Sequence, residues 1–294
     1  HAYAVKIQYP GVAESIVSDL KLVKPVALKM FNINAKDSEK YFQEVQDKLL
    51  EETDYQLELE QSEAIAQSCA GLENIRFPKY YRSLSSDRIL TMDWMDGQHI
   101  QSFAKAHKGT ELACRLGQSL WDFYMYQMHF LKKVHADPHP GNFLVDAENR
   151  LVPIDFGCMK QVPESFYTPY FALATVEAQK DRRVFDALLW DLEILVPSDD
   201  QATLNYVSDL FHELLSLFTQ PFQQDQFDFS NPAFWESVGA LSKRLSSDQS
   251  IRKMNGNRGS KHFLYINRTF YGLYNLLFDL GARVDTRSFA RYMN

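Results

Sequence analysis

The pattern of apolar and polar positions begins as a strand. Residues 3–8 alternate, so that Ala4 and Lys6 share one face of the predicted strand and the apolar side chains share the other. A Pro-Gly pair ends this alternation. Residues 12–31 then place apolar side chains at helical spacing. The sequence therefore predicts a short strand followed by a long helix.

The next part of the chain predicts an acidic helix and a pair of strands. Residues 36–67 are rich in Asp and Glu and show no Pro or Gly, which favours one long helix. Residues 75–81 and 88–94 are rich in aromatic and branched side chains, and a polar Ser-rich segment separates them. We expect these two segments to form a hairpin-like pair of strands.

The remainder of the chain is predicted to be mostly helical. Residues 111–133 place large apolar side chains at helical spacing, which is typical of a buried central helix. Two short strands are expected at 143–145 and 151–154, around a polar turn. From residue 163 onward one helix is expected to follow another, with polar loops at 220–231 and 255–260.

Composition and charge exclude several classes of protein. The 294 residues are 45% hydrophobic and 23% charged, which is ordinary for a folded globular protein. A net charge of −7 and the absence of a Lys/Arg run argue against nucleic acid as the main partner. No apolar run reaches the roughly 20 residues that a transmembrane helix needs. The three cysteines have no metal-ligand spacing, and we expect free thiols.

Two short loops carry acids and an amide in a recognisable order. The segment HADPHPGN (residues 135–142) has an Asp five positions before an Asn, and IDFG (154–157) follows a short apolar run. In protein kinases the first Asp orients or deprotonates the acceptor hydroxyl, while the Asn and the second Asp hold Mg²⁺. An isolated Asp-Phe-Gly is often a simple turn, but the ordered pair of loops predicts a phosphoryl-transfer site at Asp137, Asn142 and Asp155.

A lysine and an acidic segment fit the same kind of site. In a kinase a strand Lys holds the ATP phosphates, a small residue two positions earlier packs on adenine, and a helix Glu pairs with the Lys. Lys6 and Ala4 match the first two roles, and Gly157 would let the chain turn after the metal ligand. The pattern leaves four acids open as partners of the lysine: Glu51, Glu52, Asp54 and Glu58.

The strand predicted at 88–94 leads into a turn that fits the adenine-binding hinge of a kinase. Met92 would flank the adenine pocket, and the backbone of Asp93, Trp94 and Met95 would hydrogen-bond the base. A core strand that ends in a turn is the alternative interpretation.

Together these motifs predict an α+β fold of the protein-kinase-like, bilobal kind. Residues 1–97 would form a truncated small lobe with a few antiparallel strands and long helices. Residues 98–294 would form a mostly α-helical large lobe that holds the catalytic loop and the Asp-Phe-Gly segment.

The catalytic segment resembles the UbiB/AarF-domain atypical kinases, which include kinase-like proteins that support coenzyme Q biosynthesis. Ordinary protein kinases have Arg before the catalytic Asp, where this sequence has Ala136, and they lack the Pro-His-Pro-Gly loop. The stretches that carry the resemblance cover essentially the whole chain: VHADPHPGN (134–142), IDFG (154–157), AVKIQYPG (4–11), ETDY (52–55) with Glu58, and RTFYG (268–272).

The resemblance implies a role for each matching residue. Lys6 would anchor the phosphates, with Glu58 as its ion-pair partner, and Asp137 would be the catalytic-loop Asp. Asn142 and Asp155 would be the Mg²⁺ ligands. The family's Glu-x-Asp motif, which helps to occlude the usual protein-substrate site, would be formed by Glu52 and Asp54.

The same resemblance implies ATP and Mg²⁺ as cofactors, and ATP hydrolysis linked to binding of a lipid or quinone precursor. No protein substrate is expected. The expected setting is ubiquinone biosynthesis at a membrane surface, with a cytoplasmic or peripheral-membrane location, or a mitochondrial or plastid one in a eukaryote.

The sequence departs from the family pattern before the Lys strand, and two other functions fit its motifs. The family's Lys-x-Gly-Gln motif and its Ala-rich nucleotide loop precede the Lys strand and have no counterpart in this sequence, so we expect a fragment that binds nucleotide weakly. One rival is a small-molecule phosphotransferase of the aminoglycoside or choline kinase type, which shares the Asp–Asn spacing. The other is a pseudokinase that serves as a binding or scaffold module.

Overall fold

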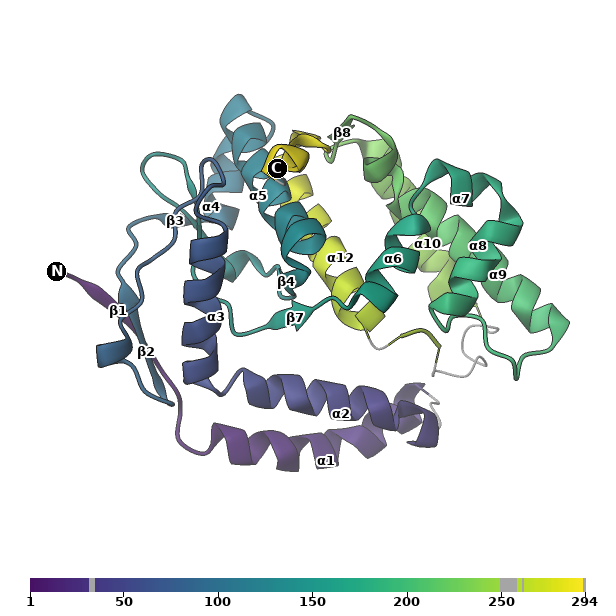
Figure 1. Ribbon diagram of the computed structural model, residues 1–294, viewed down its shortest axis with the longest axis horizontal. Helices are drawn as coiled ribbons and strands as arrows, with labels where there is room; N and C mark the ends of the chain where they lie inside the picture. Colours follow the sequence, from purple (N-terminus) through teal and green to yellow (C-terminus); the bar gives the residue numbers. More distant parts are fainter. Residues whose placement is uncertain (32–34, 249–257, 261, 293–294) are drawn as a thin grey trace.

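A computed structural model describes residues 1–31, 35–248, 258–260 and 262–292 (Figure 1). It combines many helices with small antiparallel sheets. The larger helices are α1 (Val12–Phe31), α2 (Ala35–Glu51), α3 (Tyr55–Ser68), α4 (Ile100–His107), α5 (Glu111–Tyr126), α6 (Glu164–Ala172), α7 (Val176–Lys180), α8 (Arg182–Asp191), α9 (Gln201–Phe218), α10 (Pro232–Ser247) and α12 (His262–Leu280).

The strands pair as four small sheets in the described part of the chain, ordered β1–β2, β3–β5–β6, β4–β7 and β8–β9. Short helical turns lie at Arg82–Leu84, Gln127–Leu131, Pro140–Asn142, Gln220–Gln223 and Ser288–Tyr292 (η1 to η5). The strands are β1 (Tyr3–Ile7), β2 (Ile89–Asp93), β3 (Gln98–His99), β4 (Lys133–His135), β5 (Phe143–Val145), β6 (Leu151–Pro153), β7 (Met159–Gln161), β8 (Gln226–Asp228) and β9 (Arg283–Asp285).

The first predicted strand and helix are confirmed as β1 and α1. β1 pairs with β2 in a register that sets Ala4 opposite Met92 and Lys6 opposite Leu90. Opposed residues of an antiparallel pair project from the same face. Leu90 is fully buried, so this shared face turns inward and carries Lys6 toward the interior.

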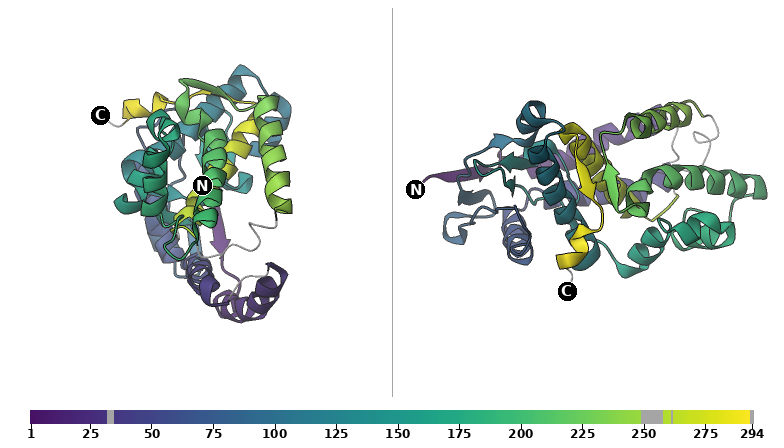
Figure 2. Two further views of the ribbon diagram at one scale, coloured as in Figure 1. Left: turned by 90° about the vertical axis from the view of Figure 1, so that its right-hand side faces the viewer. Right: turned by 90° about the horizontal axis from the view of Figure 1, so that it is seen from above.

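The prediction of one helix over 36–67 is wrong. The structure has two helices in this range, and α3 runs across the end of α2 (Figure 1). Asp54 leaves the helical conformation with φ −96° and ψ 92°, and its carboxylate accepts hydrogen bonds from the N–H groups of Gln56 and Leu57. A side chain that satisfies free N–H groups in this way starts a new helix. Because of this break, α3 has a direction of its own and does not continue α2. Helices α1 and α2 lie side by side (Figure 2).

Residues 75–81 do not form the predicted strand. Their backbone is shared between two partners, because Arg76 N–H donates to the Leu151 carbonyl at 2.8 Å while Tyr81 N–H donates to the Thr91 carbonyl at 2.9 Å. Only isolated bridges result at the two ends of the segment. The partner strand 88–94 is confirmed as β2.

The predicted central helix is confirmed over most of its length as α5. It ends earlier than expected, because residues 127–131 widen into a π-helical turn and Lys132 adopts a left-handed conformation. The helix is buried on nearly all sides, and it packs against α12 in the main hydrophobic core. Trp121 and Tyr124 are among its fully buried side chains.

The sheet β4–β7 brings the two motif loops together. It pairs His135 with Met159, so the loop after β4 and the Asp-Phe-Gly segment before β7 lie next to each other. Two further hydrogen bonds join them, from Ala136 N–H to the Cys158 carbonyl at 2.8 Å and from Ile154 N–H to the Asn142 carbonyl at 3.0 Å. The strands predicted around the intervening turn are confirmed as β5 and β6.

The C-terminal part is helical as predicted, except for one strand pair that the sequence did not reveal. β8 lies in the segment 220–231, which we expected to be a loop, and it pairs with β9 near the C-terminus. The expected loop at 255–260 lies largely outside the described residues. Helices α6 to α10 gather at the end of the molecule opposite β1 and β2 (Figure 1). None of the described helices has the length and apolar character required to span a bilayer.

Candidate functional site

Lys6, Glu58 and Asp155 meet at the centre of the candidate site. The Lys6 ammonium lies 2.9 Å from each carboxylate oxygen of Glu58 and 3.0 Å from Oδ2 of Asp155. The three residues come from β1, from the first turn of α3 and from the loop after β6. Of the four acids that the sequence left open as partners of the lysine, Glu58 is the one in contact with it.

Two local features hold this group in place. Glu58 is buried in the first turn of α3, whose start is fixed by the Asp54 cap. Asp155 receives a second hydrogen bond from Gly157 N–H at 3.0 Å. A Cβ at Gly157 would lie 3.3 Å from the Glu58 carboxylate, and the glycine has no positive φ. Gly157 is therefore needed for the close approach of α3, and not for the sharp turn that the sequence suggested.

Asp137 and Asn142 lie beside this group and are held by α12. The side-chain amide of Asn142 donates to the Asp137 carbonyl at 3.0 Å and approaches its carboxylate at 3.4 Å. Arg268 of α12 forms an ion pair with the same carboxylate. Gly272 lies one turn further along α12, and a Cβ there would lie only 2.3 Å from the Pro138 side chain. The helix can therefore reach the catalytic loop closely because residue 272 has no side chain.

Glu52 and Asp54 have different environments, although they belong to one sequence motif. Asp54 caps α3, as described above. Glu52 interacts electrostatically with Asp137, Asp155, Arg268 and Lys6, which places its carboxylate in the same cluster.

The charges of the cluster shift the pKa of each group. Burial alone would lower the pKa of Lys6, but Asp155 and Glu58 raise it above the ordinary value. Burial opposes ionisation of Asp155, yet Lys6 and the Gly157 N–H bring the pKa of Asp155 below its usual range. Burial and the neighbouring Asp155 raise the pKa of Glu58, and burial with Asp137 and Asp155 raises that of Glu52. Lys6 is therefore firmly protonated, and Asp155 is an anion at neutral pH.

Negative charge exceeds positive charge in this cluster. Four carboxylates face two cations, which leaves a formal charge of −2 when all six groups are ionised: Glu52, Glu58, Asp137 and Asp155 against Lys6 and Arg268. Among the described residues, no three acidic, His or Cys side chains converge closely enough to hold a metal by themselves. The site suits a cation that is shared between the protein and an anionic ligand.

Two of the predicted adenine-binding residues, Ala4 and Met92, lie on the same inward face as Lys6. Ala4 and Met92 are directly opposed across β1 and β2. Two of the three predicted backbone donors are already used, because Asp93 N–H donates to the Lys79 carbonyl and Trp94 N–H to the Ala2 carbonyl. In the described part of the chain the N–H of Met95 has no such partner, so it is the donor available to a base.

Sequence reasoning missed two charged residues that the fold brings to this region. Arg268 was seen only as part of a motif, and its contact with Asp137 joins positions far apart in the chain. Lys160 of β7 forms a buried ion pair with Glu44 of α2 and lies over the ring of Tyr265. The unbroken helical pattern around Glu44 gave no signal of this contact, which fixes α2 against the rest of the molecule.

Comparison with known proteins now adds to this geometry. The model of the ABC1 atypical kinase-like domain matches residues 1–188. Protein ACTIVITY OF BC1 COMPLEX KINASE 8, chloroplastic, from Arabidopsis thaliana is 27% identical over 265 residues, which cover 85% of this chain and 33% of that protein. The probable serine/threonine-protein kinase abkA of Dictyostelium discoideum is 26% identical over 270 residues, covering 87% of this chain and 46% of the relative.

A third relative and a solved structure agree with these matches. AarF domain-containing protein kinase 1 of Gallus gallus is 28% identical over 187 residues, which cover 61% of this chain and 36% of that protein. The chain thus spans less than half the length of each of these relatives. The structure of Rv3197 from Mycobacterium tuberculosis, solved in complex with erythromycin, superposes with a TM-score of 0.71 at 19% identity, covering 99% of this chain and 72% of Rv3197.

The superposition shows a shared kinase-like fold, and the family model covers well over half of the chain. The curated relatives are named as kinases of the same group. The resemblance that the sequence motifs indicated is confirmed: the chain belongs to the ABC1/AarF family of atypical kinase-like proteins.

Proposed function

We propose that the protein binds ATP and Mg²⁺ as a UbiB-type atypical kinase and uses them for phosphoryl transfer or ATP hydrolysis. The observation that supports this most strongly is the contact of Lys6 with both Glu58 and Asp155, next to Asp137 and Asn142. Kinase activity requires an ion pair between a lysine and a glutamate of this kind, together with a neighbouring aspartate that binds the metal. The proposal includes the division into a small lobe of residues 1–97 and a large lobe of residues 98–294.

Each polar group has a role that follows from its contacts. Lys6 would bind phosphate oxygens, and Glu58 would hold the ammonium in position because both of its oxygens accept from it. Asp137 would accept the proton of the attacking hydroxyl or water. Arg268 would orient the Asp137 carboxylate through their ion pair.

Asn142 and Asp155 would hold Mg²⁺. An amide oxygen and a carboxylate are the hard oxygen ligands that this ion prefers, and it usually completes its coordination with phosphates and water. The excess of two negative charges in the cluster matches a divalent cation. When bound, Mg²⁺ would neutralise charge on the phosphates.

The base would lie on the inward face of β1 and β2. Ala4 and Met92 offer an apolar surface there, while the Met95 N–H is available as a hydrogen-bond donor. The lysine on the same face would then meet the phosphates of a nucleotide that lies along the strand pair.

The position of Glu52 favours a small acceptor molecule, or water, over a protein substrate. Its carboxylate lies in the cluster with Asp137, and it would repel an acidic or bulky peptide segment at that position. The proposed role is in isoprenoid-quinone biosynthesis, including that of ubiquinone, at a membrane surface where a lipid or quinone precursor binds. The chloroplastic relatives agree with an organelle location such as the plastid.

A thermal-shift experiment tests nucleotide and metal binding together. ATP with Mg²⁺ should raise the unfolding temperature, because a ligand at 100 times its Kd adds about 2.7 kcal/mol to the free energy of unfolding. ATP without Mg²⁺ should stabilise the protein much less. Asp155→Asn should abolish the Mg²⁺-dependent part, whereas Asp191→Asn, at an exposed position of α8, should retain it. The absence of any Mg²⁺-dependent stabilisation in the unmodified protein would contradict the proposal.

A further inference from the structure

An aromatic pocket lies between α6, α9 and α12, outside the candidate ATP site. Its cavity volume is about 260 Å³. These three helices are contributed by distant parts of the C-terminal region (Figures 1 and 2). The walls are almost entirely apolar and include Phe171, Phe211, Leu215, Phe222, Phe263 and Phe270.

The polar groups that line the pocket are occupied by neighbours within the protein. The Tyr170 hydroxyl donates to Oδ1 of Asn267 at 2.8 Å, and the Tyr274 hydroxyl donates to the Phe218 carbonyl at 3.0 Å. The Thr219 hydroxyl donates to the Leu215 carbonyl at 2.6 Å. Water inside the pocket would therefore find few partners, and an apolar molecule would replace it favourably.

The rim of the pocket has the opposite character. Asn267 and Tyr271 lie one turn apart on α12, and both are exposed. In the described part of the chain the Tyr271 hydroxyl and the Asn267 amide nitrogen have no hydrogen-bond partner. The rim thus offers polar groups for hydrogen bonding to a ligand, while the interior offers none.

Tyr271 connects this pocket to the candidate active site. It also lines the open groove that holds Asp137 and Arg268, on the neighbouring face of α12. Arg268 directly follows Asn267 in the helix, so the pocket rim and the groove are adjacent. A molecule seated in the pocket would reach the groove at Tyr271.

We propose that this pocket binds a small amphipathic molecule, with an apolar body among the aromatic side chains and one hydroxyl-bearing head at the Asn267–Tyr271 rim. The volume exceeds that of a cavity of about 150 Å³ that accepts benzene, so the body has on the order of ten non-hydrogen atoms. The head faces the groove of Asp137. This binding does not require nucleotide, so it stands or falls separately from the proposed ATP chemistry.

Ligand-observed NMR titrations without nucleotide test the proposal, with n-octanol as the amphipathic probe and n-butylbenzene as an apolar probe without a hydroxyl. Both should bind the unmodified protein with a Kd of roughly 0.1–1 mM. Ala174→Met and Leu214→Phe narrow the pocket and should each weaken both probes about tenfold or more. Ala240→Met, at an exposed position of α10, is the matched control and should bind both probes normally.

Tyr271→Phe tests the position of the head group. It retains the ring and removes the hydroxyl, so n-octanol should bind about fivefold more weakly while n-butylbenzene is unaffected. Equal binding of n-octanol to the unmodified protein and to the folded pocket-narrowing variants would overturn the proposal, and two such variants are included in case one does not fold. An unchanged n-octanol affinity in Tyr271→Phe would overturn the placement of the head at the rim.

Discussion

Asp155 is partly exposed and Asp122 is buried, and the surroundings of these two carboxylates shift their pKa values in opposite directions. Asp155 faces Lys6 and the Gly157 N–H, which lower its pKa against the effect of burial. Asp122 of α5 is buried with fewer charges near it, and burial raises its pKa to about 6. The first carboxylate belongs to a cluster with a formal charge of −2 at an open groove.

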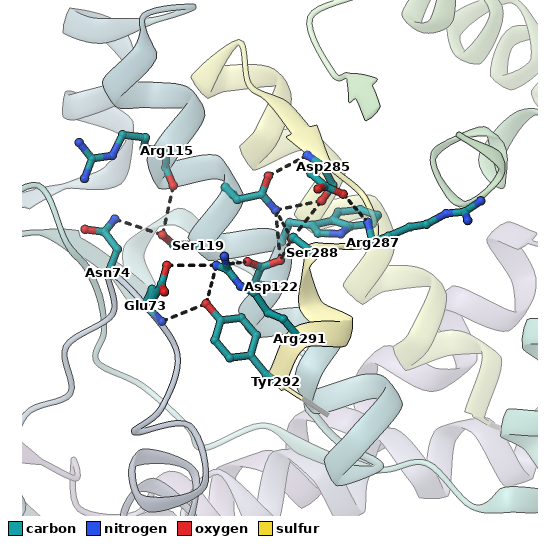
Figure 3. A network of polar contacts seen from close by, with 12 residues as sticks. Glu73, Asn74, Arg115, Ser119, Asp122, Asp285, Arg287, Ser288, Arg291 and Tyr292 are labelled. Carbon is teal, nitrogen blue, oxygen red and sulfur yellow. Dashed lines mark hydrogen bonds and ion pairs between the residues drawn. The ribbon is translucent and has the colours of Figure 1, made fainter. Parts of the chain in front are cut away.

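The surroundings of Asp122 form a closed network of hydrogen bonds (Figure 3). Ser288 donates to its carboxylate, Gln118 donates at 3.1 Å, and the Arg291 guanidinium lies 3.6 Å away. Arg291 in turn contacts Glu73, so the network ties the C-terminal turn to α5 and to the segment after α3. A shielded acid whose donors come from several elements stabilises the fold, whereas excess negative charge beside a groove indicates a ligand site.

The largest expected effect is on turnover. Asp137→Asn should lower the rate of ATP hydrolysis by about 10²–10⁴-fold, because it removes the proposed proton acceptor. Stabilisation by ATP and Mg²⁺ should persist, since Lys6, Asn142 and Asp155 are unchanged. Phosphate release and thermal shift measure the two properties, with Asp191→Asn as the control. A rate within threefold of the unmodified protein would remove Asp137 from the mechanism.

The second effect concerns the lysine contact. Lys6→Met leaves Glu58 and Asp155 facing each other without a cation, so the free energy of unfolding should fall by about 2 kcal/mol. The double variant Lys6→Met/Glu58→Met should recover most of this loss, because the remaining carboxylate has no like-charged neighbour in that pair. Nucleotide affinity should stay at least tenfold reduced in both variants, since neither has the phosphate-binding ammonium.

Chemical denaturation and nucleotide titration of the same proteins measure these two quantities. If the double variant regained nucleotide affinity together with stability, Lys6 would act by maintaining the fold and not by binding phosphate.

The third effect concerns the network around Asp122, where stability should fall without a loss of turnover. Asp122→Ala removes the buried carboxylate that accepts hydrogen bonds from Gln118 and Ser288 and faces Arg291, and it should reduce the free energy of unfolding by about 1–3 kcal/mol. ATP turnover of the folded fraction should be unchanged, because among the described residues the network and the lining of the groove share no member. A selective loss of turnover with normal stability would erase the distinction between the two acids.

The sequence predicted those parts of the fold and site that depend on local spacing. β1, α1, most of α5 and the pair β5–β6 follow from apolar periodicity within one segment. The order of Asp137, Asn142 and Asp155 could be recognised for the same reason, because each motif is contiguous. Their functional roles, and the division into two lobes, stay predictions.

The parts of the fold and the site that the sequence did not predict depend on contacts between distant segments or on a weak local signal. Arg268 meets Asp137 only because Gly272 allows α12 to pack against Pro138, which no spacing rule reveals. The break between α2 and α3 did have a signal, since Asp54 precedes the aromatic Tyr55 as an N-cap would. Because Asp54 lies in a run of acidic residues, this N-cap could not be distinguished from the other acids of the segment. Residues 75–81 were misread because their strand-like composition serves two different partners.

The smallest predicted effect is a difference in the pH dependence of stability. For Asp122 the folded pKa of about 6 exceeds the ordinary 3.8, so the folded state binds more protons between these values and stability falls as pH rises through about 4 to 6. Asp155 has the opposite sign, because its lowered pKa contributes stability that is present above pH 3.8 and is lost as pH falls through the folded pKa. Denaturation from pH 4 to 7 should therefore show the unmodified protein losing on the order of 2 kcal/mol relative to Asp122→Asn. Parallel curves for Asp122→Asn and the unmodified protein would show that Asp122 is an ordinary solvated acid, and the contrast between the two networks would rest on geometry alone.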